Sequence, residues 1–234
     1  AITRLSEETL VWLCAILLQC ELNGTWPVFA GICIIVLVPK SDGGYRPIGL
    51  LPWPVRVWMR ARRIAATRWE AAVHRPYLYA GKGMGADVAA WKQAARAELA
   101  ATAKKTVAYA TARLDLVKAF ERVPHHILVR EATRLGYPLW VLRLSLAAYR
   151  LPRSLRIGQV FSFLVVACRG ITAGSGLATS EMKLIMLHIV EGALEVAPMI
   201  QPTLFVDDLA AEAVGPGKAI AKQLAKVARA AAAP

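Results

Sequence analysis

Three carboxylates stand out because each one follows or separates apolar, strand-like segments in a chain that has few acids. Asp115 comes directly after residues 106–114, and the pair Asp207-Asp208 lies between two short apolar runs. If these strands are neighbours in one sheet, the side chains converge, and carboxylates packed together repel unless a cation lies between them. Mg²⁺ prefers oxygen ligands and is usually held by one or two carboxylates together with substrate phosphates. The pattern therefore indicates a divalent-cation site, and two ions about 4 Å apart would suit in-line phosphoryl transfer.

The pair Asp207-Asp208 also has a simpler interpretation. The apolar runs at 203–206 and 209–214 predict a hairpin with both carboxylates at its turn. Asp is common in solvated turns, where it performs no chemistry. Taken alone, the pair leaves both interpretations open.

The elements that must position these side chains follow from apolar periodicity and turn residues. Ser6 suits a helix N-cap, and Asn23-Gly24 suits a helix end. Helices and strands interleave without the regular alternation of a doubly wound sheet, so we expect an α+β fold. The predicted helices are 6–20, 55–72, 86–103, 124–135, 138–150, 179–196 and 218–233, and the predicted strands are 28–38, 45–50, 106–114, 154–157, 161–167, 203–206 and 209–214.

Charge and composition narrow the class of partner. The chain has 234 residues, is 56% hydrophobic and carries a net charge of +13, which excludes a disordered chain and favours a polyanionic partner, either nucleic acid or an anionic membrane. The longest apolar run, 28–38, is far shorter than the roughly 20 residues that span a bilayer, so we expect no membrane-spanning segment. Residues 40–113 contain fourteen basic side chains and only four acidic ones. Arg56, Arg60 and Arg63 would share one helix face, which serves either as a binding surface or as an ordinary solvated face.

Four segments resemble motifs of reverse transcriptases, especially those of non-LTR retrotransposons. Residues 115–128, DLVKAFERVPHHIL, are similar to the first palm motif, and residues 205–208, FVDD, are similar to the aromatic-x-Asp-Asp motif. Residues 38–48, VPKSDGGYRPI, resemble the fingers motif, and residues 169–178, RGITAGSGLA, resemble the glycine-rich motif. The four segments occur in the family's order, and the resemblance covers nearly the whole chain from residue 6 to residue 214.

The resemblance implies an α+β fold with the fingers and palm of a right-hand polymerase, an antiparallel palm sheet packed on helices, and no thumb. Residues 1–105 would form the fingers and residues 106–234 the palm. The implied activity is RNA-directed DNA synthesis, in which two Mg²⁺ ions, with Mn²⁺ as a substitute, assist nucleotide transfer from a dNTP to a primer 3′-hydroxyl. The implied partners are an RNA or DNA template with its primer, and thumb or nuclease domains of a longer polyprotein. The implied location is an intracellular ribonucleoprotein, nuclear or cytoplasmic.

The resemblance also assigns roles to individual residues. Asp115 and Asp207 would be the principal metal ligands, with Asp208 secondary because consecutive strand residues face opposite ways. Phe120 would pack under the sugar and leave no room for a 2′-hydroxyl. The implied nucleotide-binding residues are Lys40, Arg46, Leu116 through its carbonyl, Phe120 and Gly174, and the implied template or primer contacts are Arg56, Arg60, Arg63, Gly170 and Ser175.

Two departures from the family pattern keep other functions open. Ala173 stands where the motif usually has Gln, and Glu121 replaces the usual Asp. A nucleic-acid-binding relic that lost catalysis is therefore one alternative. An RNA-dependent RNA polymerase with a similar palm is another, and Phe120 disfavours it.

Overall fold

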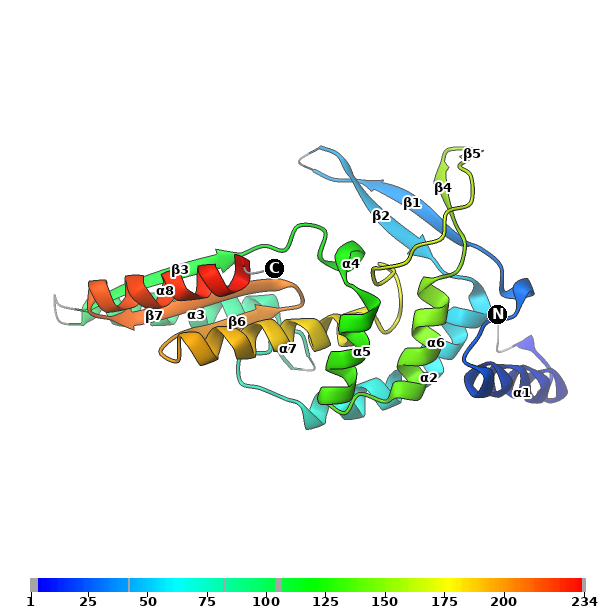
Figure 1. Ribbon diagram of the computed structural model, residues 1–234, viewed down its shortest axis with the longest axis horizontal. Coiled ribbons are helices and arrows are strands. Elements are labelled where there is room, and N and C mark those ends of the chain that lie inside the picture. The colour runs from blue at the N-terminus through cyan, green and yellow to red at the C-terminus, as the bar shows by residue number, and fades with distance from the viewer. Residues whose placement is uncertain (1–3, 42, 82, 104–106, 233–234) are drawn as a thin grey trace. The chain divides into compact units, whose positions relative to one another are not determined.

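The computed structural model describes residues 4–41, 43–81, 83–103 and 107–232 (Figure 1). The chain forms two compact units, each built from two stretches of sequence. Unit 1 comprises Ala1–Ala72 and Phe120–Glu181, and unit 2 comprises Val73–Ala119 and Met182–Pro234. The division into fingers and palm at residue 105 stays a prediction. No helix within the described ranges combines the length and the apolarity needed to cross a membrane.

Unit 1 contains a mixed sheet in the strand order β2-β1-β4-β5. Strand β1 (Cys33–Pro39) pairs antiparallel with β2 (Tyr45–Leu50) and parallel with β4 (Arg153–Ile157), which pairs antiparallel with the short β5 (Val160–Phe161). The predicted strand at 28–38 begins too early, because Val28–Ala30 forms a short 3-10 helix, η2, that ends at Gly31 with a φ of 89°. The predicted strand at 161–167 is also too long, since after β5 the chain returns to the sheet only at an isolated bridge between Val165 and Arg153.

Helices complete unit 1, and their ends follow the capping residues. In α1 (Glu7–Asn23) the side chain of Ser6 accepts a hydrogen bond from the Thr9 amide, and Gly24 ends the helix in the left-handed conformation. The core lies around Trp58 and Met59 of α2 and Leu142 and Tyr149 of α6, all buried. The remaining helices of this unit have these bounds: α2 (Trp53–Ala72), α4 (Ala119–Arg122), α5 (His125–Arg134) and α6 (Leu139–Tyr149).

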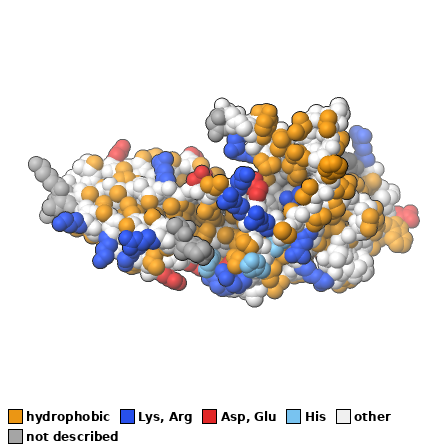
Figure 2. All heavy atoms as spheres, turned by 45° about the horizontal axis from the view of Figure 1, so that its top comes forward, with side chains coloured by type: hydrophobic (Ala, Val, Ile, Leu, Met, Phe, Trp, Pro, Cys, Tyr) orange, Lys and Arg blue, Asp and Glu red, His pale blue; other side chains and the backbone are white. Residues whose placement is uncertain are grey.

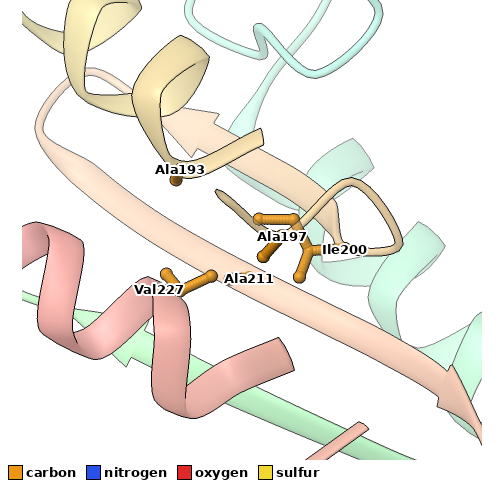
Figure 3. Close-up of a cluster of buried hydrophobic side chains, with 5 residues drawn as sticks. All are labelled: Ala193, Ala197, Ile200, Ala211 and Val227. Carbon is orange, nitrogen blue, oxygen red and sulfur yellow. The ribbon is translucent and has the colours of Figure 1, made fainter. Parts of the chain in front are cut away.

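Unit 2 is built on an antiparallel sheet in the order β3-β7-β6. The strands are β3 (Ala108–Leu114), β6 (Gln201–Phe205) and β7 (Asp208–Gly215). One face packs on α7 (Ala178–Val196) and α8 (Gly217–Ala232) through the buried cluster shown in Figure 3, which consists of Ala193, Ala197, Ile200, Ala211 and Val227.

The opposite face of this sheet is covered in part by α3 (Ala86–Thr102) and is polar. Arg96 of α3 pairs with the fully buried Glu212 of β7 and donates to the Thr203 hydroxyl at 3.2 Å. The Tyr109 hydroxyl donates to the other carboxylate oxygen of Glu212 at 2.5 Å. These bonds fix α3 against the sheet, and the helices and mainly antiparallel sheets together confirm the α+β prediction.

Candidate active site

Two of the three predicted carboxylates line one pocket at the end of the unit 2 sheet. Leu114 pairs with Leu209, so Asp115 follows β3 where Asp208 begins β7. Both side chains are exposed and line a pocket of about 470 Å³. Asp207, predicted as the second principal ligand, lies half-buried in the adjoining turn and does not line this pocket.

The turn that carries Asp207 has a strained backbone. Phe205 pairs with Asp208, so only Val206 and Asp207 connect the two strands. Val206 has a φ of 59°, a conformation that a β-branched residue rarely adopts. Such strain persists where the surrounding structure holds it, and it concentrates at functional sites. The strained turn therefore supports this hairpin as a candidate functional site.

Helix α3 supplies the pocket wall that the sequence did not indicate. Ala86, Ala89, Ala90 and Gln93 of α3 face the sheet across the pocket, and Phe205 and Arg113 contribute from the strands. The alanines leave space, while Gln93 and Arg113 add polar groups beside the carboxylates. The spacing of Ala86, Ala89 and Ala90 is a helix-face pattern, but nothing in the sequence shows which surface that face meets.

The donor set suits Mg²⁺ bound with substrate. No group of three or more His, Cys, Asp or Glu side chains gathers as a metal centre within the part of the chain that the structure describes. Asp115 and Asp208 nevertheless supply two carboxylates to one pocket, and Mg²⁺ commonly takes one or two, completing its octahedron with water and phosphate oxygens. The residues present therefore fit a divalent ion that binds together with a phosphate-bearing substrate.

Leu116 and Lys118 form a tight turn directly after Asp115. The Ala119 amide donates to the Leu116 carbonyl at 3.2 Å, and Lys118 between them has a φ of 56°. A carbonyl oxygen has two lone pairs, so this bond leaves one free for the predicted metal contact.

Unit 1 contains a basic groove. Arg56, Arg60 and Arg63 of α2 line a pocket of about 460 Å³ together with Gly174 and Gly176. All three arginines are exposed, and among the described residues none of them forms an ion pair. On the face of the molecule drawn in Figure 2, Lys and Arg side chains stand out, whereas Asp and Glu are few. The groove can therefore receive a polyanion.

Position 174 requires a glycine because the backbone passes very close to β2 there. A Cβ at this position would lie 2.5 Å from the Gly49 carbonyl oxygen, and the φ of Gly174 is 107°. The Gly49 amide in turn donates to the Ala173 carbonyl at 2.7 Å. The role of Gly49 was missed, although an isolated glycine in a predicted strand often marks such an approach.

Gly170 and Ser175, predicted as template or primer contacts, are bound within unit 1. The Gly170 carbonyl accepts a hydrogen bond from His125 Nε2 at 2.9 Å, and burial lowers the pKa of His125. The Ser175 hydroxyl lies 3.0 Å from the Tyr149 hydroxyl, which donates to the fully buried Glu181. Burial raises the pKa of Glu181 to about 7, although the bond from Tyr149 acts in the opposite direction. Both residues thus hold the glycine-rich segment in place.

The structure of this segment predicts that Gly170→Ala destabilises the protein. The φ of Gly170 is 92°, and a Cβ would lie 2.7 Å from the Glu121 carbonyl oxygen, which is backbone and cannot rotate away. We expect a loss of about 2 kcal/mol in the free energy of unfolding, measured by urea titration. Gly136→Ala is the matched control, because its φ of 67° is also positive but a Cβ there meets nothing within 4 Å. Equal losses would show that backbone strain alone, without the Glu121 contact, explains the effect.

The remaining predicted nucleotide-binding residues lie in unit 1. Lys40 follows β1 and Arg46 lies on β2 opposite Val38, and both side chains are exposed. Phe120 is half-buried, and its carbonyl accepts the Ile171 amide at 2.7 Å. That bond ties the first palm motif to the glycine-rich segment.

A family model described as reverse transcriptase (RNA-dependent DNA polymerase) matches residues 38–233, which is most of the chain. The chain belongs to the reverse transcriptase family. No curated protein sequence matches this reverse transcriptase domain.

The fold of the reverse transcriptase domain is similar to that of telomerase from Candida tropicalis. An apo structure truncated from the C-terminal domain has a TM-score of 0.62 at 13% identity, over 89% of this chain and 47% of that one. A second apo structure has a TM-score of 0.60 at 11% identity, over 94% and 45%. A complex with a TWJ fragment of telomeric RNA has a TM-score of 0.55 at 13% identity, over 84% and 38%. The reverse transcriptase domain thus spans less than half the length of these telomerase chains.

Proposed function

We propose that this reverse transcriptase domain catalyses RNA-directed DNA synthesis by transferring a nucleotide from a dNTP to a primer 3′-hydroxyl. The observation that carries the proposal is the pocket shared by Asp115 and Asp208, in a chain whose family copies RNA into DNA. In the reaction the primer 3′-hydroxyl releases its proton to water and its oxygen bonds to the α-phosphorus. The bond from that phosphorus to the oxygen shared with the β-phosphate breaks, and pyrophosphate leaves.

Each group of residues has a distinct task in this proposal. Asp115 and Asp208, with Asp207 beside them, hold Mg²⁺ or Mn²⁺, and when bound these ions stabilise the attacking and leaving oxygens. Lys40 and Arg46 neutralise the triphosphate through charge-assisted hydrogen bonds. Arg56, Arg60 and Arg63 hold phosphates of the template or primer, and the glycines beside them let the nucleic-acid backbone approach.

Primer extension with Mg²⁺ tests this function. The chain is given a primed RNA template or a primed DNA template, with deoxy- or ribonucleotides. We expect deoxynucleotide incorporation on RNA, with ribonucleotides used far more slowly because Phe120 fills the space of the 2′-hydroxyl. Equal rates for the two nucleotides would contradict the role of Phe120.

A relic that only binds nucleic acid is favoured by one observation. Ala173 replaces a glutamine, so no side-chain amide is available at that position, and its carbonyl already accepts from Gly49. Tight binding of primed template without extension under any nucleotide or metal condition would support the relic and contradict the polymerase.

A further inference from the structure

Helix α8 carries a row of exposed cations that the proposed chemistry does not use. Lys218, Lys222, Lys226 and Arg229 are all exposed. At 3.6 residues per turn they lie within an arc of about 80°. The helix sequence, GKAIAKQLAKVARAAA, contains no Asp or Glu, and alanines separate the cations. The stripe is therefore purely basic, and its long side chains extend beyond the neighbouring methyl groups.

The orientation of this basic stripe is fixed by the other side of the helix. Ile220 and Val227 are buried, and Leu224 packs against the cluster that joins α8 to the sheet. Figure 3 shows Val227 within that cluster. These three apolar residues lie on the helix side opposite the cations. The pocket of Asp115 and Asp208 adjoins α3, which covers the other face of the same sheet. Within unit 2, the basic stripe and the carboxylate pocket are thus separate surfaces.

The arrangement of these cations opposes helix stability. Lys218, Lys222 and Lys226 follow one another at i, i+4 spacing, where like charges destabilise a helix by about 0.2–0.5 kcal/mol per pair. Lys218 also lies in the first turn, where the helix dipole disfavours a positive charge. A helix that needed only solubility would gain from acids placed between the lysines. The pattern therefore points to an external partner that supplies the missing negative charge.

The length of the stripe indicates an extended polyanion. Successive lysines are separated by about 6 Å along the helix axis, and Arg229 extends the row to roughly 16 Å. One phosphate or one acidic side chain would engage only part of such a row, whereas a nucleic-acid strand carries a charge about every 3.4 Å. A membrane-bound amphipathic helix inserts its apolar face into lipid, but the apolar face of α8 is already buried in unit 2.

We infer that the exposed face of α8 binds the sugar-phosphate backbone of a nucleic acid, at a surface separate from the carboxylate pocket. The inference rests on the proposed function only for the class of partner. Binding at such a stripe is independent of base sequence and gains its free energy from released counterions. It would keep the template attached to unit 2 while substrates exchange at the carboxylate pocket.

The test compares two variants that lose the same charge. The stripe variant carries Lys218→Gln, Lys222→Gln and Lys226→Gln, because Gln keeps helix propensity and removes only the cations. The control carries Arg4→Gln, Arg68→Gln and Arg122→Gln, which are exposed in unit 1 and lie outside the arginine groove. Affinity is measured across a salt series with an RNA duplex, a DNA duplex of the same sequence and single-stranded RNA.

For the stripe variant we expect the slope of log affinity against log salt to become shallower by about 3 on duplexes, one contact for each lysine. The control should keep the slope of the unmodified chain. The probe that shows the largest change identifies which nucleic acid is bound. An unchanged slope in the stripe variant, an equal change in the control, or efficient competition by anionic lipid vesicles would each overturn the inference.

The same samples separate this inference from the proposed function. Primer extension reports the carboxylate pocket, whereas the salt slope reports α8. A shallower slope in a chain that synthesises no DNA would support the α8 contact and count against the polymerase. A stripe variant that synthesises DNA and keeps the slope of the unmodified chain would support the polymerase and contradict the α8 contact.

Discussion

Asp115→Asn is expected to reduce Mg²⁺-dependent primer extension by about a thousandfold. The substitution keeps the side-chain volume and removes the charge that binds the metal, and metal assistance is worth several kcal/mol to such reactions, at 1.36 kcal/mol for each factor of ten. Because Asp115 is exposed, the free energy of unfolding should change by no more than about 0.5 kcal/mol. Mn²⁺ binding, followed by water-proton relaxation, should weaken in parallel.

Asp87→Asn is the matched control for this variant. Asp87 also lies in unit 2, in the first turn of α3, but it does not line the carboxylate pocket. It should leave extension and Mn²⁺ binding unchanged. Retention of extension within tenfold in Asp115→Asn would end the metal-ligand assignment. Asp207→Asn and Asp208→Asn then decide whether the second ligand is the residue predicted from the sequence or the one that lines the pocket.

Glu181→Gln is expected to stabilise the protein at pH 8 by about 3 kcal/mol. Burial raises the pKa of Glu181 from its ordinary value of 4.5 to about 7. Between these values the folded state keeps a proton that the unfolded state has released, so the stability of the unmodified chain falls as pH rises from 4.5 to 7 and stays low above 7. Gln imitates the protonated acid, and its amide oxygen can still accept from Tyr149, so the variant avoids that loss.

Urea unfolding at several pH values between 4.5 and 8 measures this effect. The difference between variant and unmodified chain should be near zero at pH 4.5 and greatest above pH 7. Glu131→Gln is the matched control, because Glu131 is equally buried but pairs with Arg130 and Arg134, so the loss of its charge should destabilise the protein. If Glu181→Gln were less stable than the unmodified chain at pH 8, the prediction would be wrong, because the surrounding residues would then stabilise the ionised carboxylate.

Local signals predicted much of the fold. The caps of α1 at Ser6 and Gly24 were predicted correctly because each depends on one local residue. The Ser6 side chain caps the first turn, and Gly24 adopts the left-handed conformation that ends the helix. The β6–β7 hairpin was also predicted, since two apolar runs flank a short connection. The turn itself was predicted one residue too late, because it consists of Val206 and Asp207, and Asp208 already belongs to β7. The parallel pairing of β1 with β4 was not predicted, because the two strands are more than a hundred residues apart and no local pattern joins them.

The candidate site was predicted where it depends on local spacing and not where it depends on tertiary contacts. The i, i+4, i+7 spacing correctly placed Arg56, Arg60 and Arg63 together, since all three lie on one helix. Gly170 and Ser175 have the residue types of a ligand-binding loop and form hydrogen bonds within unit 1, so their contact with template or primer stays a prediction. Glu181 is fully buried, and no sequence pattern indicates this, because an acid in an otherwise apolar helix is usually exposed.

The pairing of β3 with β7 makes the position of the carboxylates depend on residues that do no chemistry. Side chains alternate between the faces of a sheet, so a shift of one residue in this pairing would move Asp115 to the side occupied by the Ala211 and Val227 cluster. Such a shift would also turn Leu114 away from the buried cluster that it packs against. Small apolar side chains in the middle of the sheet therefore set the strand register that positions the acids at its end. Substitutions among them would abolish the pocket's activity without touching the pocket.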